Sequence, residues 1–261
     1  MVVAMENREY ASVIGSSAAP GINGLARRYG LATAAYGESH PSLPNYLELV
    51  AGTTFGVVDD CTTCAVDGPT LVDQLETAGI GWAAYLEGVP GPCFTGAAAG
   101  RYAKRHNPFV YVTHLVRDPR ACARLRPLSA LPADLAAPDG PAFVWVTPDL
   151  CHDGHDCATA EADAWVSQFI ASVRATPWYS GGGAIVLVWD EGSTSAGCCS
   201  RARGGHIPLV VVSEAMATSR RLDQPLASAG VLRGIERRYS LGFLGDAACA
   251  CNGDLFPLLA A

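Results

Sequence analysis

The sequence predicts an α/β fold, a three-layer sandwich in which helices cover both faces of a mainly parallel central sheet. Uninterrupted apolar runs of strand length, typical of strands buried on both faces, occur at residues 2–5, 143–146, 184–189 and 206–212. Segments with apolar residues at helical spacing lie between these runs. This alternation is typical of parallel sheets with crossover helices.

In the first half of the chain, helices are predicted where apolar residues recur at helical spacing between start and stop signals. Pro20 begins one helix and Gly30 follows it, Ser42 and Thr70 stand where helices would begin, and Gly52 stands where one would end. The predicted elements are a strand at 2–5, a helix at 20–30, a strand at 31–36, a helix at 42–52, a loop at 53–69, a helix at 70–79 and a strand at 82–86.

The second half begins with an irregular stretch, residues 88–108, that is rich in Gly and Pro. The short apolar run Phe109–Val112 predicts a short strand or a buried extended piece, and Trp165 and Phe169 lie on one face of a predicted helix. The remaining predicted elements are a helix at 128–136, a strand at 143–146, a helix at 160–175, strands at 184–189 and 206–212, and a final helix at 226–239.

Composition argues against two classes of protein. The net charge is −7 and the sequence has no basic stripe, so nucleic acid is not an expected partner. No apolar run approaches the length that spans a bilayer, so no integral membrane segment is expected. Because 261 residues can bury a full core and no repeats or low-complexity linkers occur, residues 1–261 are expected to form a single domain.

Ten cysteines, mostly in close pairs within loop-like sequence, favour disulfides formed in an oxidising compartment. They are Cys61/Cys64, Cys93, Cys122, Cys151/Cys157, Cys198/Cys199 and Cys249/Cys251. A structural zinc site is the alternative, but only Cys61 and Cys64 have the spacing of zinc ligands. No signal peptide is recognised, because the first residues already resemble a strand; the mature chain of a secreted protein would have such a sequence. Secretion is inferred from the cysteines alone.

Ser42 lies in the stretch Ser39-His40-Pro41-Ser42-Leu43-Pro44-Asn45, directly before an apolar run at helical spacing. Its hydroxyl would face the free N–H groups and the positive end of the dipole at the start of a helix. Such a position suits a phosphate or an ionised oxygen. The alternative is that Ser42 only caps the helix by accepting a hydrogen bond from one of these N–H groups.

Polar residues follow several of the predicted strands, at the sheet edge where sites form in open α/β folds. They are Glu6, Asn7, Asp149, His152, Asp153, His155, Asp156, Asp190, Glu191 and His206. Each has a structural alternative, such as a place in a disulfide loop, in a turn, or as a hydrogen-bonded histidine. Together, carboxylates and imidazoles around one hydroxyl suit a metal-assisted displacement, in which a cation lowers the pKa of the hydroxyl. The pattern therefore favours a metal or phosphate site.

The polar residues at the predicted strand ends stand within a series of short motifs. These motifs are Met5-Glu6-Asn7-Arg8, His40-Pro41-Ser42-Leu43-Pro44-Asn45-Tyr46, Gly100-Arg101-Tyr102 with His106-Asn107-Pro108-Phe109, Thr147-Pro148-Asp149-Leu150 through His155-Asp156, Trp189-Asp190-Glu191-Gly192 and Gly204-Gly205-His206-Ile207-Pro208. Together and in this order, they resemble the bacterial phosphoesterase family of acid phosphatases and phospholipases C, within the alkaline phosphatase superfamily. The resemblance spans residues 2–245 and implies an alkaline-phosphatase-like fold and hydrolysis of phosphoric esters.

The resemblance also implies roles for single residues. Ser42 matches the nucleophile, which would form a phosphoseryl intermediate, and its oxygen would be a metal ligand. Asn45 matches an amide that steadies a phosphoryl oxygen in the related nucleotide pyrophosphatases. The other matches to metal-site residues are Glu6, Asn7, Asp190 and Glu191.

Further matches concern the leaving group and the substrate. Asp149, His155 and His206 match positions that hold a second metal in two-metal relatives, or that bind phosphate and help the leaving group in one-metal members. His106 and Asn107 match a motif expected at the substrate mouth.

Two features depart from the family pattern. His152 stands where Asn is expected, and the adjacent pair Cys198-Cys199 leaves the shape of its loop open. Sulfatases share the fold, but Asn45 occupies the place of the Arg that their aldehyde-forming motif requires, which argues against sulfatase chemistry.

The sequence thus predicts a secreted, metal-dependent phosphatase that hydrolyses phosphate monoesters in two displacements. Ser42 would attack phosphorus, and water activated by His155 or His206 would hydrolyse the phosphoserine. One or two divalent ions are expected per chain; oxygen ligands favour Mg²⁺, Ca²⁺ or Mn²⁺, and added histidines favour Zn²⁺. The alternatives are a phospholipase C-type phosphodiesterase acting on a phospholipid headgroup and a noncatalytic, disulfide-stapled secreted binding protein.

Overall fold

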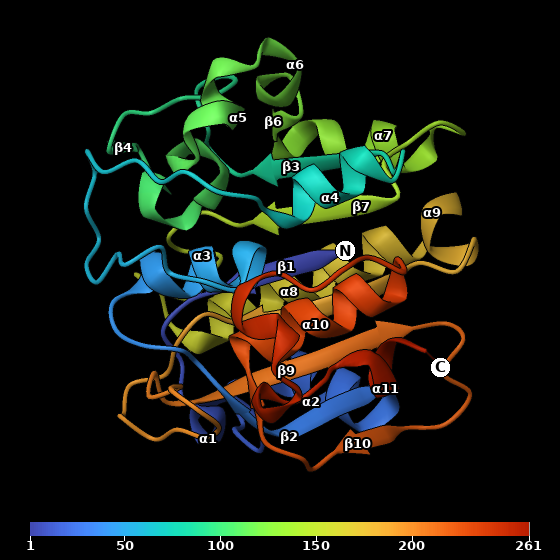
Figure 1. Cartoon of the computed structure of the whole chain (residues 1–261). Coiled ribbons are helices and arrows are strands. Elements are labelled where there is room, and N and C mark those ends of the chain that lie inside the picture. The colour runs from blue at the N-terminus through green and yellow to red at the C-terminus, as the bar shows by residue number, and fades with distance from the viewer. Residues whose placement is uncertain (261) are drawn as a thin grey trace.

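Nine strands form the central sheet of the computed structural model, which describes residues 1–260. Their order is β10-β2-β9-β8-β1-β7-β3-β6, with β11 also paired to β2 (Figure 1). Strand β9 runs antiparallel to its neighbours β8 and β2, and the other pairs are parallel. The strands are β1 Val2–Met5, β2 Gly30–Tyr36, β3 Trp82–Leu86, β6 Leu125–Pro127, β7 Phe143–Thr147, β8 Ala184–Trp189, β9 His206–Ser213, β10 Arg220–Leu222 and β11 Leu226–Ala227.

Helices cover both faces of this sheet, so the predicted three-layer α/β sandwich is confirmed. Helices α3, α4 and α10 lie on the face nearer the viewer in Figure 1, and α2 and α8 pack together on the far face. The α-helices are α1 Tyr10–Val13, α2 Pro20–Arg28, α3 Ser42–Ala51, α4 Leu71–Thr77, α5 Thr113–Arg117, α6 Pro119–Cys122, α7 Leu131–Ala136, α8 Thr159–Arg174, α9 Pro177–Ser180, α10 Ser228–Arg238 and α11 Phe256–Leu259. The short elements are β4 Ala98–Ala99, β5 Tyr102–Ala103 and the 3-10 helices η1 Lys104–His106, η2 Pro108–Tyr111, η3 Leu128–Ala130, η4 Gly245–Ala248 and η5 Ala250–Asn252.

One predicted element differs in type and another in its bounds. The strand expected at 109–112 is instead the 3-10 helix η2, because Pro108 at its first position fixes a helical φ and supplies no N–H for a strand ladder. The helix expected at 226–239 begins only at Ser228, because Leu226–Ala227 pair with β2, and η4, η5 and α11 follow it.

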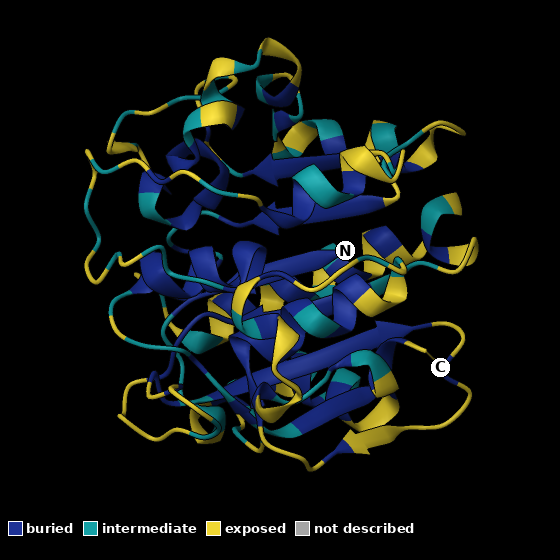
Figure 2. Ribbon diagram, in the orientation of Figure 1, coloured by how far each residue is buried: buried dark blue, intermediate teal, exposed yellow. Residues whose placement is uncertain are grey.

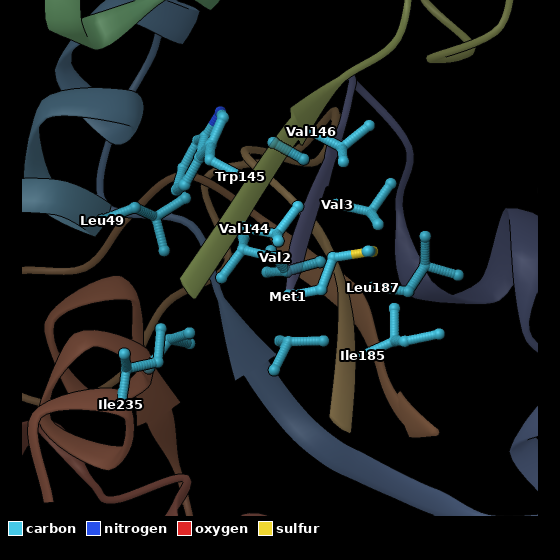
Figure 3. Packing of buried hydrophobic residues seen from close by; sticks show 14 of the residues in the cluster. Met1, Val2, Val3, Leu49, Val144, Trp145, Val146, Ile185, Leu187 and Ile235 are labelled. Carbon is cyan, nitrogen blue, oxygen red and sulfur yellow. The ribbon is translucent and has the colours of Figure 1, made fainter. Parts of the chain in front are cut away.

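The sheet buries its strands between the two helical layers. Figure 2 shows the central strands in the colour of buried residues, whereas the edge strand β10 is exposed at Arg220 and Arg221, and other exposed residues lie on the outer helices and loops. In Figure 3, Leu49 of α3 and Ile235 of α10 lie beside residues of β1 and β7, including Trp145. All residues of α3 are buried, from Ser42 to Ala51, so packing fixes the orientation of this helix and of its first residue.

The direction of the strands brings the predicted site residues to one edge, on the left in Figure 1. Because β1, β7 and β8 are parallel, Glu6, Asp149 and Asp190 follow strand ends at this same edge. Strand β9 runs the other way, so its first residue, His206, lies there as well. Strand β2 is antiparallel to β9, and the loop after it carries the chain to Ser42.

The cysteines of the chain are all paired, which confirms the predicted disulfides. The bridges are Cys61–Cys64, Cys93–Cys122, Cys151–Cys157, Cys198–Cys199 and Cys249–Cys251. Cys61 and Cys64 form a disulfide with each other, so their thiolates are not available as ligands for a zinc ion. Within residues 1–260, no helix combines the length and the apolar character that crossing a membrane requires.

Glu48 is an ionisable group inside α3, and we expect it to make stability depend on pH. Its side chain is buried, and its Oε1 atom has no hydrogen-bond partner among the described residues. Burial, with the charges of Glu38 and Asp246 adding, raises the pKa of Glu48 from 4.5 to about 8. The folded state therefore keeps a proton that the unfolded state loses, and stability falls as pH rises through this window.

The variant Glu48→Gln should be more stable than the parent at pH 8.5 by about 1–3 kcal/mol, because it has no proton to lose. At pH 4, where both states of the parent bind the proton, the two proteins should differ little. Urea unfolding at both pH values measures this difference. Equal destabilisation of the variant at both pH values would show that Glu48 stays ionised in the fold.

Candidate active site

Ser42 is the first residue of α3 and does not cap it. The capping residue is Pro41, which has no side-chain acceptor, and the N–H of Leu43 donates to Oδ1 of Asp60 at 2.9 Å. The Ser42 hydroxyl instead donates to Oε2 of Glu6 at 3.0 Å and lies 3.5 Å from Oε1 of Glu191. The capping alternative is therefore wrong, and the buried hydroxyl lies among carboxylates.

The predicted metal residues Glu6, Asn7, Asp190 and Glu191 gather around Ser42. Asn7 has a left-handed backbone with φ of 50°, which Asn tolerates better than most residues, and its N–H donates to Oδ1 of Asp190 at 3.1 Å. Three buried oxygens of this cluster have no hydrogen-bond partner among the described residues: Oε1 of Glu6, Oδ1 of Asn7 and Oδ2 of Asp190.

The electrostatics of this cluster favour a bound cation. Burial, with the charge of Asp190 adding, raises the pKa of Glu6 well above its usual range. Burial and the charge of Glu191 do the same to the pKa of Asp190. Buried oxygens without partners cost free energy, and a hard divalent cation takes carboxylate, amide and hydroxyl oxygens as ligands. The residues present therefore fit such an ion.

Asp149 lies in a different group from the other predicted metal residues. Its N–H donates to Oε2 of Glu87 at 3.0 Å, and Nδ1 of His152 lies 2.9 Å from the same Glu87 oxygen. Glu87, Asp149 and His152 each offer one ligand atom within a span that could hold a metal ion. Asp149 therefore lies with Glu87 and with His152, which stands where Asn was expected.

His106 lies beneath the cluster, where a substrate does not reach it, so its predicted place at the mouth was wrong. Its Nε2 is 3.2 Å from Oε1 of Glu6, its Nδ1 is 3.3 Å from Oδ2 of Asp153, and its ring stacks on Tyr46. Only 1% of His106 is exposed. Burial lowers the pKa of His106 and raises that of Asp153 to about 7.

Asn107 and Asn45 are also internal, and the structure corrects their predicted contacts with the substrate. Asn107 is buried, and its amide donates to the hydroxyl of Tyr102 at 3.1 Å. The Asn45 side chain accepts from the N–H groups of Glu38 and Ser39 and donates to the carbonyl oxygens of Ser39 and Pro41. With these four bonds made, the Asn45 amide braces the loop before Ser42 and has no capacity left for a phosphoryl oxygen.

The two candidate general-base histidines have different surroundings. The ring of His155 lies 5.8 Å from that of His106, its Nδ1 is 2.7 Å from Oδ1 of Asp156, and its Nε2 is 3.2 Å from Nη2 of Arg105. His206 stacks on Tyr10 and Tyr36, and its Nε2 donates to the carbonyl oxygen of Thr33 at 2.9 Å. None of the contacts recorded for residues 1–260 joins His206 to Ser42 or Glu6.

Three residues near this site received no role from the sequence. Oδ2 of Asp153 lies 3.3 Å from Nδ1 of His106, and its place after a predicted strand was its only signal. His40 pairs through Nδ1 with Glu191 and lies two residues before Ser42 in a motif that the sequence singled out. Arg105 contacts His155, and nothing in its sequence context separates it from a surface arginine.

Comparison with known proteins identifies relatives of the chain and of its fold. The profile of the Phosphoesterase family matches residues 14–242. Phosphatidylinositol-3-phosphatase of Mycobacterium tuberculosis is 32% identical over 96% of this chain and 79% of its own length. An acid phosphatase of Aspergillus fumigatus is 27% identical over 95% of this chain, which spans about half of that relative's length (56%). The fold matches that of an alkaline phosphatase superfamily protein from Vibrio parahaemolyticus, with a TM-score of 0.61, 12% identity, and coverage of 95% of this chain and 69% of that one.

The fold and these relatives thus define a hydrolase of phosphoric esters with the architecture of the alkaline phosphatase superfamily. Within that class, the chain belongs to the Phosphoesterase family.

Proposed function

We propose that this chain is a secreted, metal-dependent phosphatase that hydrolyses phosphate monoesters through a phosphoserine on Ser42, with residues 1–261 acting as one domain. The Ser42 hydroxyl at the start of α3, held against Glu6 among buried oxygens without partners, is the observation that carries the proposal. The five disulfides support secretion, because disulfides form in oxidising compartments.

In the first displacement, the oxygen of Ser42 attacks phosphorus and the ester oxygen leaves. Oε2 of Glu6 accepts the hydrogen bond of this hydroxyl, so it is the nearest acceptor for the proton that Ser42 loses. In the second displacement, water attacks the phosphoserine and releases phosphate. His155 is the better candidate to take the proton of that water, because it lies beside the buried His106, whereas Nε2 of His206 is committed to Thr33.

The residues that would hold the metal ion are Glu6, Asn7, Ser42, Asp190 and Glu191. When bound, a divalent ion lowers the pKa of a ligand hydroxyl and neutralises charge that develops on the phosphoryl oxygens. A set made of oxygen atoms alone favours Mg²⁺, Ca²⁺ or Mn²⁺ over Zn²⁺. Glu87, Asp149 and His152 are the candidates for a second ion.

The names of the relatives support a monoester substrate. The mycobacterial relative is named for removal of a phosphate from a phosphoinositide, and the fungal relative is named an acid phosphatase. A small phosphate monoester, free or on a lipid headgroup, is therefore the substrate class that we propose. The competing function is a phosphodiesterase of the phospholipase C type.

Hydrolysis of a matched aryl phosphate monoester and diester, each with and without a chelator, tests the proposal. We expect faster hydrolysis of the monoester and loss of both activities with the chelator, restored by added divalent metal. Preference for the diester would assign the chain to the phosphodiesterases. Absence of both activities in folded, metal-loaded protein would favour the noncatalytic binding protein.

A further inference from the structure

Arg105 contacts the side chain of His155, the candidate general base, and the mechanism has not used it. It lies in η1 directly before His106, and its side chain is about one quarter exposed (28%). Its Nη2 is 3.2 Å from Nε2 of His155, and its Nε is 3.5 Å from Oδ2 of Asp60. The guanidinium therefore links the candidate general base to an acidic side chain.

The proton positions on His155 follow from its neighbours. Nδ1 lies 2.7 Å from the carboxylate of Asp156, so Nδ1 carries the hydrogen and donates it. Nε2 then has a lone pair, which accepts from Arg105, because a guanidinium has only donors. The nitrogen that would take a proton from water is thus occupied by Arg105 when no substrate is bound.

Asp60 occupies a position suited to the anionic group of a substrate. One of its oxygens accepts from the N–H of Leu43, next to the nucleophile, and the other faces Arg105. A phosphoryl group bound at Ser42 would need the same donors, an N–H at a helix start and a guanidinium.

We propose that Arg105 binds the phosphoryl oxygens of the substrate and that Asp60 occupies their place in the free enzyme. This inference rests on the proposed function. The phosphate of a monoester carries two negative charges, one more than the Asp60 carboxylate that it displaces from Arg105. The phosphate of a diester carries one negative charge, the same as that carboxylate. The exchange of Asp60 for phosphate therefore selects monoesters over diesters, and Arg105 is a specificity-determining residue.

The variant Asp60→Asn tests the exchange, because it keeps the acceptor for Leu43 and removes only the charge. Inorganic phosphate is the probe, and its Ki as a competitive inhibitor is the readout. We expect the Ki to fall about fivefold, the effect of one partly exposed ion pair, and the monoester-to-diester ratio of kcat/KM to fall as well. Asp59→Asn, which changes the same charge at the neighbouring exposed position, should leave both unchanged.

The variant Arg105→Gln should raise the Ki for phosphate about 10- to 100-fold and lower kcat/KM for the monoester more than for the diester. Arg105→Lys should recover part of the loss, because it restores the charge without the planar fork. Arg101→Gln removes an exposed charge from the same segment and serves as the control.

An unchanged or raised Ki in Asp60→Asn would overturn the exchange, leaving Asp60 as a cap of α3. An unchanged monoester-to-diester ratio in Arg105→Gln would overturn the role in specificity. Failure of the proposed function is distinguishable from both outcomes. The parent enzyme would then fail to hydrolyse the monoester, or the variant Ser42→Ala would still hydrolyse it. Calorimetry would still measure the binding of inorganic phosphate to the parent and to the Arg105 and Asp60 variants.

Discussion

The variant Ser42→Ala should lose turnover of phosphate monoesters by a factor on the order of 10⁴ or more, because no other group can form the covalent intermediate. The fold should be nearly unaffected. The Ser42 hydroxyl does not cap α3, where the N–H of Leu43 donates to Asp60 instead, so its removal costs no cap. The hydroxyl donates only to carboxylates, and these can bind a metal ion or a proton when the hydroxyl is removed.

Kinetics with an aryl phosphate, together with circular dichroism and metal analysis, checks this prediction. Ser39→Ala is the matched control: it lies in the same loop, and its backbone rather than its hydroxyl bonds to Asn45. The control should retain most of the parent activity. Activity of folded Ser42→Ala within tenfold of the parent would remove Ser42 as the nucleophile.

The second large effect should come from Asp190→Asn. Asp190 is fully buried, and its Oδ2 has no partner among the described residues, so we assign it to the metal ion. Loss of this ligand should lower kcat/KM by at least about 100-fold and weaken metal binding by a similar factor. Metal at 100 times its Kd should stabilise the parent by about 2.7 kcal/mol, and this gain should largely disappear in the variant.

Without metal, the order of stability should reverse at alkaline pH. Burial raises the pKa of Asp190 in the folded state, so the metal-free parent loses stability as pH rises above the value at which the unfolded carboxyl ionises. The variant has no such charge and should be at least as stable as the metal-free parent at pH 8. Thermal unfolding with chelator and with metal measures both effects, with Asp139→Asn as an exposed control. An equal metal-induced shift of Tm in parent and variant would exclude Asp190 as a ligand.

Local sequence signals predicted the sheet and the residues that its strand ends carry. The buried strands were recognisable as uninterrupted apolar runs, and Glu6, Asn7, Asp190 and Glu191 were located because they follow such runs directly. Orientation was harder to predict. His206 lies at the shared edge only because β9 is antiparallel, which no local signal near residue 206 shows.

The errors concern contacts between segments that are distant in the chain. Asp60 is 17 residues from Leu43 and supplies the acceptor that was expected from Ser42. His106 was expected at the mouth, but Asp153 and Glu6, from two other segments, hold it inside. All hydrogen-bonding groups of the Asn45 side chain are occupied by the backbone of the loop before Ser42. A motif indicates that a residue matters, whereas its partners depend on how the whole chain packs.

The stereochemical course at phosphorus tests the central claim, a phosphoserine on Ser42, most directly. A monoester made chiral at phosphorus with three oxygen isotopes would be hydrolysed in the presence of an alcohol acceptor, and the configuration of the transferred phosphoryl group determined. Two successive in-line displacements each invert phosphorus, so the phosphoserine mechanism predicts overall retention. Overall inversion would show a single direct displacement by the acceptor, without a covalent intermediate, and would contradict the role of Ser42 as the nucleophile.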